Sequence, residues 1–315
     1  MPFQRFICFL GLMLAPLCAG AADTPTYGLA VGSMAGGYKE LAQELAQAVS
    51  VPQDRKACRK AGNCHPFPLQ FQLVPSSTAA AALSKVRAGL APFVLMPAPL
   101  ATLALQGGDR LIPAVPTLQA VAAVAHRGLL ILVPPAHDGI GVASLAGTKL
   151  GVVAPGPDLL RCAQLVLSGL GMDMARTTTV PLATVGDGLR RLQRGQLGAL
   201  VILGHQDDFI AASESSGVAA LTLGKSEVRR LLTSASWARE QTLTVAGQRV
   251  RSVGYHDLLL TRSDVPPDTV RAVLERLSLG ARQASLLDVS ALDDNGPIPH
   301  HLAVMTQETK DAAPH

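Results

Sequence analysis

A glycine-rich turn carries the residues whose types and spacing best suit chemistry with a ligand. It comprises Gly32, Ser33, Met34, Ala35, Gly36, Gly37 and Tyr38. An apolar strand is expected before it, at residues 27–31, and Leu41 and Leu45 follow at helical spacing. At such a strand-to-helix turn, backbone N–H groups can bind an anion or a polar ligand head. A tight turn without a ligand explains the glycines equally well.

Three histidine-containing pairs raise the possibility of hydrolytic chemistry. They are His137-Asp138, His256-Asp257 and His300-His301. A serine hydrolase also needs a nucleophile at a sharp elbow such as Gly-x-Ser-x-Gly, and residues 32–36 do not match that pattern. Neighbouring residues on a strand also point to opposite faces. We therefore expect a binding protein without a cofactor, and an exported hydrolase is the less favoured alternative.

The cysteines indicate one disulfide and one buried thiol. Cys58 and Cys64 flank a polar turn and could close a small loop in an oxidising compartment. A metal site that adds His65 and either His300 or His301 is a weaker alternative. Cys162 lies within an apolar helical pattern, which predicts a buried free thiol.

The first 22 residues have the pattern of a secretory signal peptide. Arg5 precedes an apolar run, and small residues end the segment, with cleavage expected after Ala21 or Ala22. The run is too short for a membrane span, so we expect an exported, periplasmic protein. The net charge of +4 is modest and scattered, and no basic stripe with interleaved aromatic residues occurs, so nucleic acid is not an expected partner.

A repeating strand–helix pattern must position these residues. Strands are expected at 68–74, 93–96, 149–153 and 200–203, and helices at 79–88 and 159–167. Residues 118–133 predict two further strands, interrupted at His126-Arg127-Gly128. Such repeats form parallel sheets with ligand loops at the carboxyl ends of the strands. Those loops contain Ser76, Ser77 and Thr78, then Met96 and Pro97, then Pro155, Gly156, Pro157 and Asp158, and finally Gly204 and His205. Asp158 is expected to cap the helix that follows it.

Four of these stretches together resemble the solute-binding subunits of TRAP transporters of the TAXI type. Residues 32–38 resemble the family's GSTGGTYY turn, and residues 146–156 resemble its LkGkrvsvG…pGSGT segment. Residues 203–206 resemble its aGHP turn, and residues 298–303 resemble its lHpGA tail. The resemblance implies a type II periplasmic binding protein fold with two lobes. Each lobe would be a mainly parallel sheet flanked by helices, with the ligand cleft between them. Lobe 1 would comprise residues 23–125 plus 254–315, and lobe 2 residues 126–253.

The resemblance also implies a function, with a reservation about the ligand. Members capture a small organic solute and deliver it to a membrane permease; a sensor of the same fold that partners a membrane signalling protein is the alternative. The family's GSGT appears here as Gly156-Pro157-Asp158-Leu159, which removes two hydroxyls and adds a carboxylate. A carboxylate in the cleft disfavours an anionic solute unless a cation pairs with it, so we expect a ligand other than a simple dicarboxylate.

Overall fold

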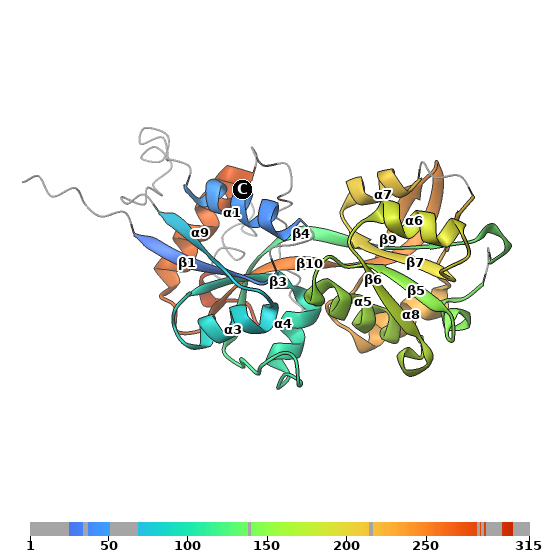
Figure 1. Cartoon of the computed structure of the whole chain (residues 1–315). Helices are drawn as coiled ribbons and strands as arrows, with labels where there is room; N and C mark the ends of the chain where they lie inside the picture. The colour runs from blue at the N-terminus through green and yellow to red at the C-terminus, as the bar shows by residue number, and fades with distance from the viewer. Residues whose placement is uncertain are drawn as a thin grey trace, which may run out of the picture.

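The computed structural model describes residues 25–33, 37–50, 69–137, 140–213, 217–281, 284, 287 and 298–304. The expected signal peptide and the Cys58–Cys64 pair lie outside these residues, as do Met34 and Gly36 of the glycine-rich turn. Figure 1 shows the helices and strands gathered into two bodies that share long strands.

The first body is built from parallel strands covered by helices. Strand β1 (Thr26–Val31) pairs in parallel with both β2 (Gln70–Pro75) and β3 (Phe93–Pro97). The helices are α1 (Tyr38–Ser50), α3 (Ala79–Arg87), α4 (Ala98–Leu105) and α9 (Pro267–Gly280). Helix α9 begins with a proline at its first helical position, where the missing N–H costs least. The expected strand–helix repeats are confirmed in this body.

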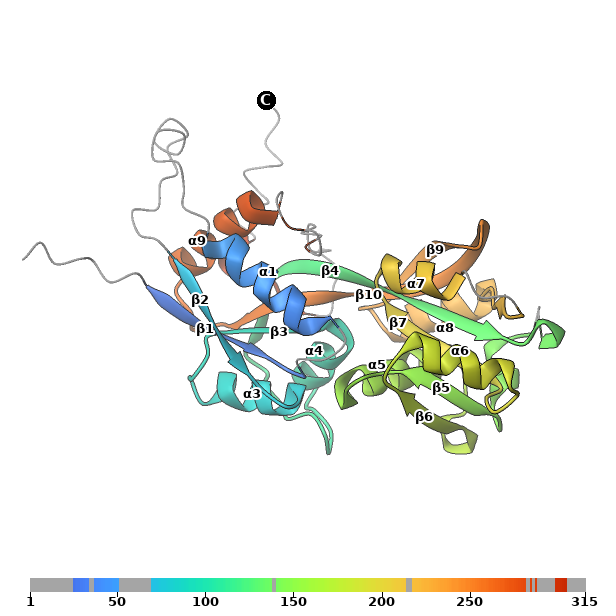
Figure 2. The same ribbon diagram turned by 45° about the horizontal axis from the view of Figure 1, so that its top comes forward.

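The second body repeats the arrangement. Its parallel core consists of β5 (Lys149–Val153), β6 (Thr178–Leu182) and β7 (Ala199–Gly204). Helices α5 (Pro157–Gly169), α6 (Val185–Gln193), α7 (Gln206–Ser213) and α8 (Lys225–Ser234) flank it, and the short β8 (Ala219–Ala220) adds to β4. Figure 2 shows α5 and α6 lying with β5 and β6 in this body.

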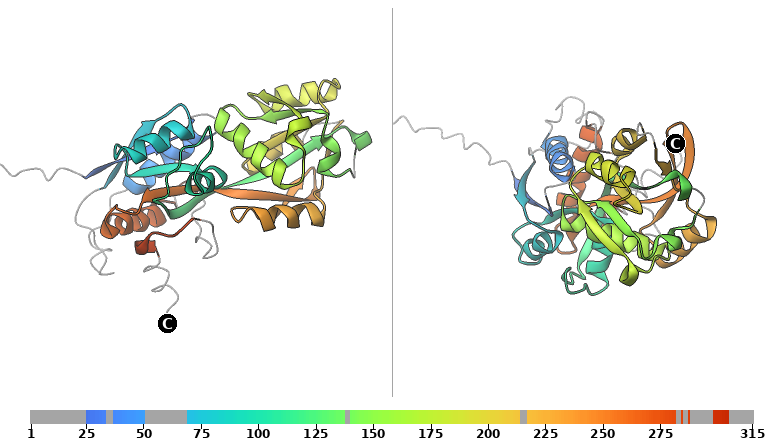
Figure 3. Two further views of the ribbon diagram at one scale, coloured as in Figure 1. Left: turned by 90° about the horizontal axis from the view of Figure 1, so that it is seen from below. Right: turned by 45° about the vertical axis from the view of Figure 1, so that its right-hand side comes forward.

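Two long antiparallel strands join the bodies. Strands β4 (Leu118–Val133) and β10 (Gln248–Arg262) run from one body to the other, as the left panel of Figure 3 shows for β10. The complete order is β2-β1-β3-β10-β4-β7-β5-β6. The described strands therefore form one continuous sheet, in which β10 and β4 link β3 to β7.

The expected interruption of residues 118–133 is wrong, because β4 continues through it as one strand. Its earlier residues pair with β10, and Gly128 then begins pairing with β7 opposite Gly204. The chain needs no break at this point, since the strand simply exchanges one neighbour for another. The hairpin strand β9 (Arg239–Val245), paired with β10, was not predicted.

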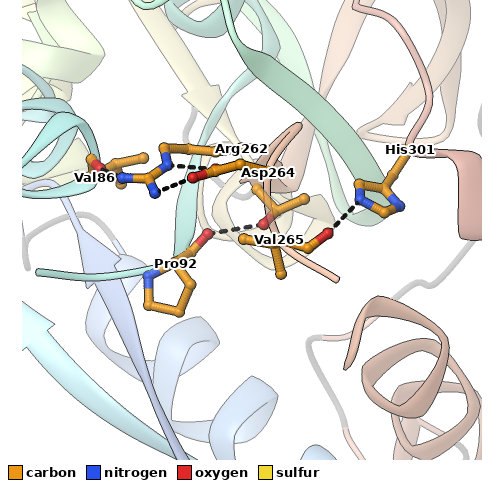
Figure 4. Close-up of polar contacts among 7 residues, drawn as sticks. Val86, Pro92, Arg262, Asp264, Val265 and His301 are labelled. Carbon is orange, nitrogen blue, oxygen red and sulfur yellow. Dashed lines mark hydrogen bonds and ion pairs between the residues drawn. The ribbon is translucent and has the colours of Figure 1, made fainter. Parts of the chain in front are cut away.

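One apolar cluster extends through both bodies and a second lies in the second body, and residues 298–304 pack against the first body. His301 is buried, and its Nε2 bonds the carbonyl oxygen of Val265 at 3.0 Å (Figure 4). Its Nδ1 accepts from the N–H of Ala303, so the ring is held at both nitrogens. In the same region Arg262 bonds Asp264 and the carbonyl oxygen of Val86 (Figure 4). His301 therefore has a structural role.

Within the described part of the chain, no helix is long and apolar enough to cross a membrane.

Candidate functional site

Asp158 is at the start of α5, but it does not cap the helix as expected. Gly156, with extended backbone dihedrals, occupies the cap position, and Pro157 follows as the first helical residue. Proline suits that position because its ring presets the helical φ angle. Asp158 is thereby moved one residue into the first turn, and its side chain is free to reach away from its own helix.

The Asp158 carboxylate instead crosses to the other body. Its Oδ2 accepts hydrogen bonds from the backbone N–H of Ser33 at 3.0 Å and from that of Ala79 at 2.8 Å. Ser33 belongs to the glycine-rich turn after β1, and Ala79 is the first residue of α3. The carboxylate is only 8% exposed. Two turns of one body therefore meet a charged side chain of the other.

The sequence around these two donors suits a close approach. A Cβ on Gly32 would lie 2.8 Å from Asp158 Oδ2, so only glycine leaves room for the carboxylate. Thr78 caps α3 by accepting from the N–H of Ala81, which leaves the Ala79 N–H pointing out of the helix. First-turn N–H groups have no partner within their own helix, and Asp158 supplies one.

A second charged group is buried where β4 and β10 pass between the bodies. Arg127 Nε donates to Asp257 Oδ2 at 2.7 Å, and these side chains are 1% and 0% exposed. The hydroxyl of Tyr38, the first residue of α1, donates to the other oxygen of Asp257. The guanidinium also lies over the Tyr38 ring, 4.4 Å from its centroid. The glycine-rich turn is thus anchored to the connecting strands.

Burial governs the protonation of this cluster. It raises the pKa of the Tyr38 and Tyr255 hydroxyls and of the Cys162 thiol well above their ordinary values. Burial is the largest single influence on Arg127 and opposes its charge, but Asp257, Tyr38 and Tyr255 together outweigh it and raise the pKa of the guanidinium. The two phenols and the thiol are therefore neutral, and the Arg127 guanidinium is charged. The expected buried, free state of Cys162 is confirmed.

His205 follows β7 and contacts a connecting strand. Its Nδ1 lies 3.0 Å from the carbonyl oxygen of His126, which can only accept, so Nδ1 carries the proton. Burial and, to a smaller degree, the charge of Arg127 lower the pKa of His205 below 6.5. The ring is therefore neutral near pH 7 and fixes the end of β7 against β4.

The other described candidate residues lie at the ends of strands or in the turns that follow them. Met96 is buried in β3, Pro97 caps α4, and Gly204 pairs with Gly128. Gly37 has a φ of +79°, which favours glycine, at the entry to α1. In the turn after β2 the Ser76 hydroxyl is buried without a hydrogen-bond partner among the described residues, whereas Ser77 is exposed. Pro155 is exposed before α5.

The histidine pairs do not assemble a hydrolytic site. His256 and Asp257 point to opposite sides of β10: Asp257 binds Arg127, and the His256 ring stacks edge-to-face on His126 at 5.2 Å. The His137 side chain and Asp138 lie outside the described residues. No group of His, Cys, Asp and Glu side chains suited to a metal occurs among the residues that the structure describes.

Sequence reasoning missed Arg127. Its segment was interpreted as an interruption between strands, although a single arginine inside a long apolar run is itself a signal that a buried anion lies nearby. It also missed the pair between Arg161 of α5 and Asp109, at 2.7 Å, which forms a second, partly exposed contact between the bodies.

Comparison with known proteins identifies the fold. No known family model matches the chain, and no curated protein matches it either. A protein from Xanthomonas citri, solved with chloride ion, is 10% identical over 91% of this chain and 99% of that one, with a TM-score of 0.53. The structure of that protein with ATP is 11% identical over 92% of this chain and 100% of that one, with a TM-score of 0.52. A TctC solute binding protein from Polaromonas, solved without ligand, is 15% identical over 85% of this chain and 91% of that one, with a TM-score of 0.50. The chain therefore has the mixed α/β architecture of two-lobed periplasmic binding proteins.

Proposed function

We propose that this protein is an exported solute-binding protein. It captures a small polar solute between two lobes and delivers it to a membrane transporter of the TRAP type. The single observation that carries the proposal is the convergence of Ser33, Ala79 and Asp158 at one point. The two amide donors come from one body and the carboxylate from the other, so groups able to bind a solute face each other across the junction.

The proposed lobes are residues 23–125 plus 254–315 and residues 126–253. The boundaries fall within β4 and β10, beside the Arg127–Asp257 pair. A β-bulge also interrupts the register of these strands between Asp257 and Leu258. In the described sheet, β10 and β4 link β3 to β7, so these two strands are suited to act as a hinge between the lobes.

The proposed ligand site comprises the turns that the sequence predicts at the carboxyl ends of the strands. It includes residues 32–34 and 36–38 after β1, residues 76–78 after β2, Met96 and Pro97, residues 155–158 at the start of α5, and Gly204 with His205. The charged side chains near the proposed site limit which solutes it can bind. Arg127 is already neutralised by Asp257, and Asp158 adds a carboxylate, so a dicarboxylate would meet repulsion without a matching cation. A small polar or zwitterionic solute fits better.

Two sequence features support the proposed transporter and compartment. The resemblance to TAXI-type subunits supports a TRAP-type permease as the partner, and the signal-peptide pattern of residues 1–22 supports export to the periplasm. A cleaved N-terminus beginning near Ala22 or Asp23 in protein from the source cells is the expected mark of export.

Solute capture is tested on protein purified from its own host. We expect native mass spectrometry to detect a retained solute, because closed lobes release it slowly. Calorimetric titration of the wild type and Asp158→Asn with glutamate, glutamine and a small amine then defines the charge preference. We expect the wild type to reject glutamate. Tight glutamate binding that is unchanged in Asp158→Asn would contradict the charge argument, and absence of both a retained solute and any titratable ligand would contradict the function.

A further inference from the structure

The amide groups of Ser33 and Ala79 form a pocket for one anionic oxygen. The two N–H groups belong to different elements, yet they point at the same atom, with N–O distances of 3.0 and 2.8 Å. The second donor is at the first turn of α3, where the helix dipole favours negative charge. The missing side chain at Gly32 provides the space, since a Cβ there would lie 2.8 Å from the bound oxygen and 3.1 Å from the Ala79 nitrogen.

The occupant of this pocket is a side chain of the same chain. Asp158 lies 125 residues from Ser33 and 79 from Ala79, on a helix of the other body. Its carboxylate is more than nine-tenths buried. An aspartate that only favoured its own helix dipole would gain nothing by reaching across. Its placement instead gives two donors of the first body an anionic partner and joins the bodies together.

We propose that the Ser33 and Ala79 amides form a carboxylate-binding site that Asp158 occupies in cis, as a tethered competitor of free small carboxylates. While Asp158 is bound, it holds the two bodies together without a solute. A free carboxylate reaches the amides only after Asp158 withdraws, which requires the bodies to separate. The inference deepens the proposed function, because it assigns the occupant of the proposed cleft.

Competition with a tethered group has a measurable consequence. The bound fraction of Asp158 reduces the apparent affinity of the site for an external ligand, since only the vacated site is competent. Removing the side chain should therefore create a binding site that the wild type lacks. Asp158→Ala vacates the pocket and keeps a good helix former, whereas Asp158→Asn fills the same space without charge.

Formate is the probe, because it is the smallest carboxylate. The thermal transition and the small-angle scattering profile of the full chain are measured as sodium formate replaces sodium chloride at constant ionic strength. We expect Asp158→Ala to be more open than the wild type and to become compact and more heat-stable with saturable formate. Its apparent affinity for formate should exceed that of the wild type by at least about tenfold.

Two matched variants separate the pocket from a general loss of contact between the bodies. Arg161→Met removes the ion pair with Asp109, but it leaves Asp158 in the pocket, so it should gain no formate response. Asp158→Asn keeps a side chain that can fill the pocket, so its formate response should be weaker than that of Asp158→Ala. Equal formate responses in the wild type and Asp158→Ala, or no response in a folded Asp158→Ala, would overturn the proposal.

The test remains decisive if Asp158→Ala fails to fold. In that case the scattering of Asp158→Asn without formate is compared with that of the wild type. We expect the neutral side chain to hold the bodies less firmly and the profile to be more extended, and identical profiles would overturn the tethered role. None of these measurements uses the natural solute. Failure of solute capture would thus refute the proposed function alone, and failure of the formate response would refute the tethered carboxylate alone.

Discussion

Replacing Asp257 by asparagine should destabilise the protein severely, because it leaves the charge of Arg127 buried without a counter-ion. Both side chains are at most 1% exposed and lie 2.7 Å apart, so water does not take over when the carboxylate is removed. Breaking one partner of a buried pair costs about 3–5 kcal/mol of unfolding free energy. The asparagine oxygen can still accept from Arg127 Nε, so we expect the lower part of that range.

Urea unfolding of a small set of variants tests the reasoning. Tyr38→Phe removes only the hydroxyl that donates to Asp257, and a hydrogen bond to a charged group contributes about 1.5–3 kcal/mol. Arg127→Met combined with Asp257→Asn removes the unpaired charge as well. We expect the unfolding free energy lost by this double variant to be smaller, by at least about 1 kcal/mol, than the sum of the losses of Arg127→Met and Asp257→Asn alone. An Asp257→Asn loss below about 1 kcal/mol, or losses that simply add, would refute the argument.

Three further predictions concern separate parts of the chain. Gly32→Ala places a Cβ 2.8 Å from Asp158 Oδ2 and should lower the unfolding free energy by about 1–3 kcal/mol, with a smaller loss when Asp158 is also alanine; equal losses in urea titrations would contradict this. Burial lowers the pKa of His205, so the unfolded chain binds the proton more readily, and stability present above pH 6.5 should fall as the pH drops below it; a His205→Gln curve just as steep in that window would exclude the histidine as the cause. Cys58 and Cys64 should form a disulfide worth on the order of 2 kcal/mol, and thiol labelling of exported protein without reductant should find neither reactive.

Much of the fold could be predicted because its signals are local. The apolar segments 93–96 and 200–203 are short and continuous, as expected for strands buried on both faces, and each is followed by a turn and a helix. The strand β9 was not predicted because five of its seven residues are polar, and its pairing with β10 depends on the turn at Ala246 and Gly247. Both turn residues have a positive φ angle, and an alanine at position 246 does not predict such an angle.

The site was harder to predict because its contacts are not local. The Pro157-Asp158 turn predicted a carboxylate near the expected cleft, and the structure places this carboxylate at the contact between the two bodies. Its direction could not be predicted, since it depends on how closely α5 approaches the turn after β1. The expected helix cap also failed for a local reason: Pro157 and Asp158 both suit the first turn, and proline took the position that places Gly156 at the cap.

The two carboxylates at the junction restrict how a solute can enter. Asp257 is committed to Arg127 and Tyr38, and Asp158 is committed to the Ser33 and Ala79 amides. A solute that takes the place of Asp158 leaves its carboxylate without the two amide donors. That carboxylate lies in a region of low exposure, where an unpaired charge is costly. A purely anionic solute would satisfy the amides but leave Asp158 beside a second negative charge. A zwitterion could place its carboxylate on the amides and its cation beside Asp158. The amides and the displaced carboxylate would then each have a partner of opposite charge. The arrangement of charges thus favours a zwitterionic solute over a dicarboxylate, on the same physical ground that makes Asp158 an effective occupant when no solute is bound.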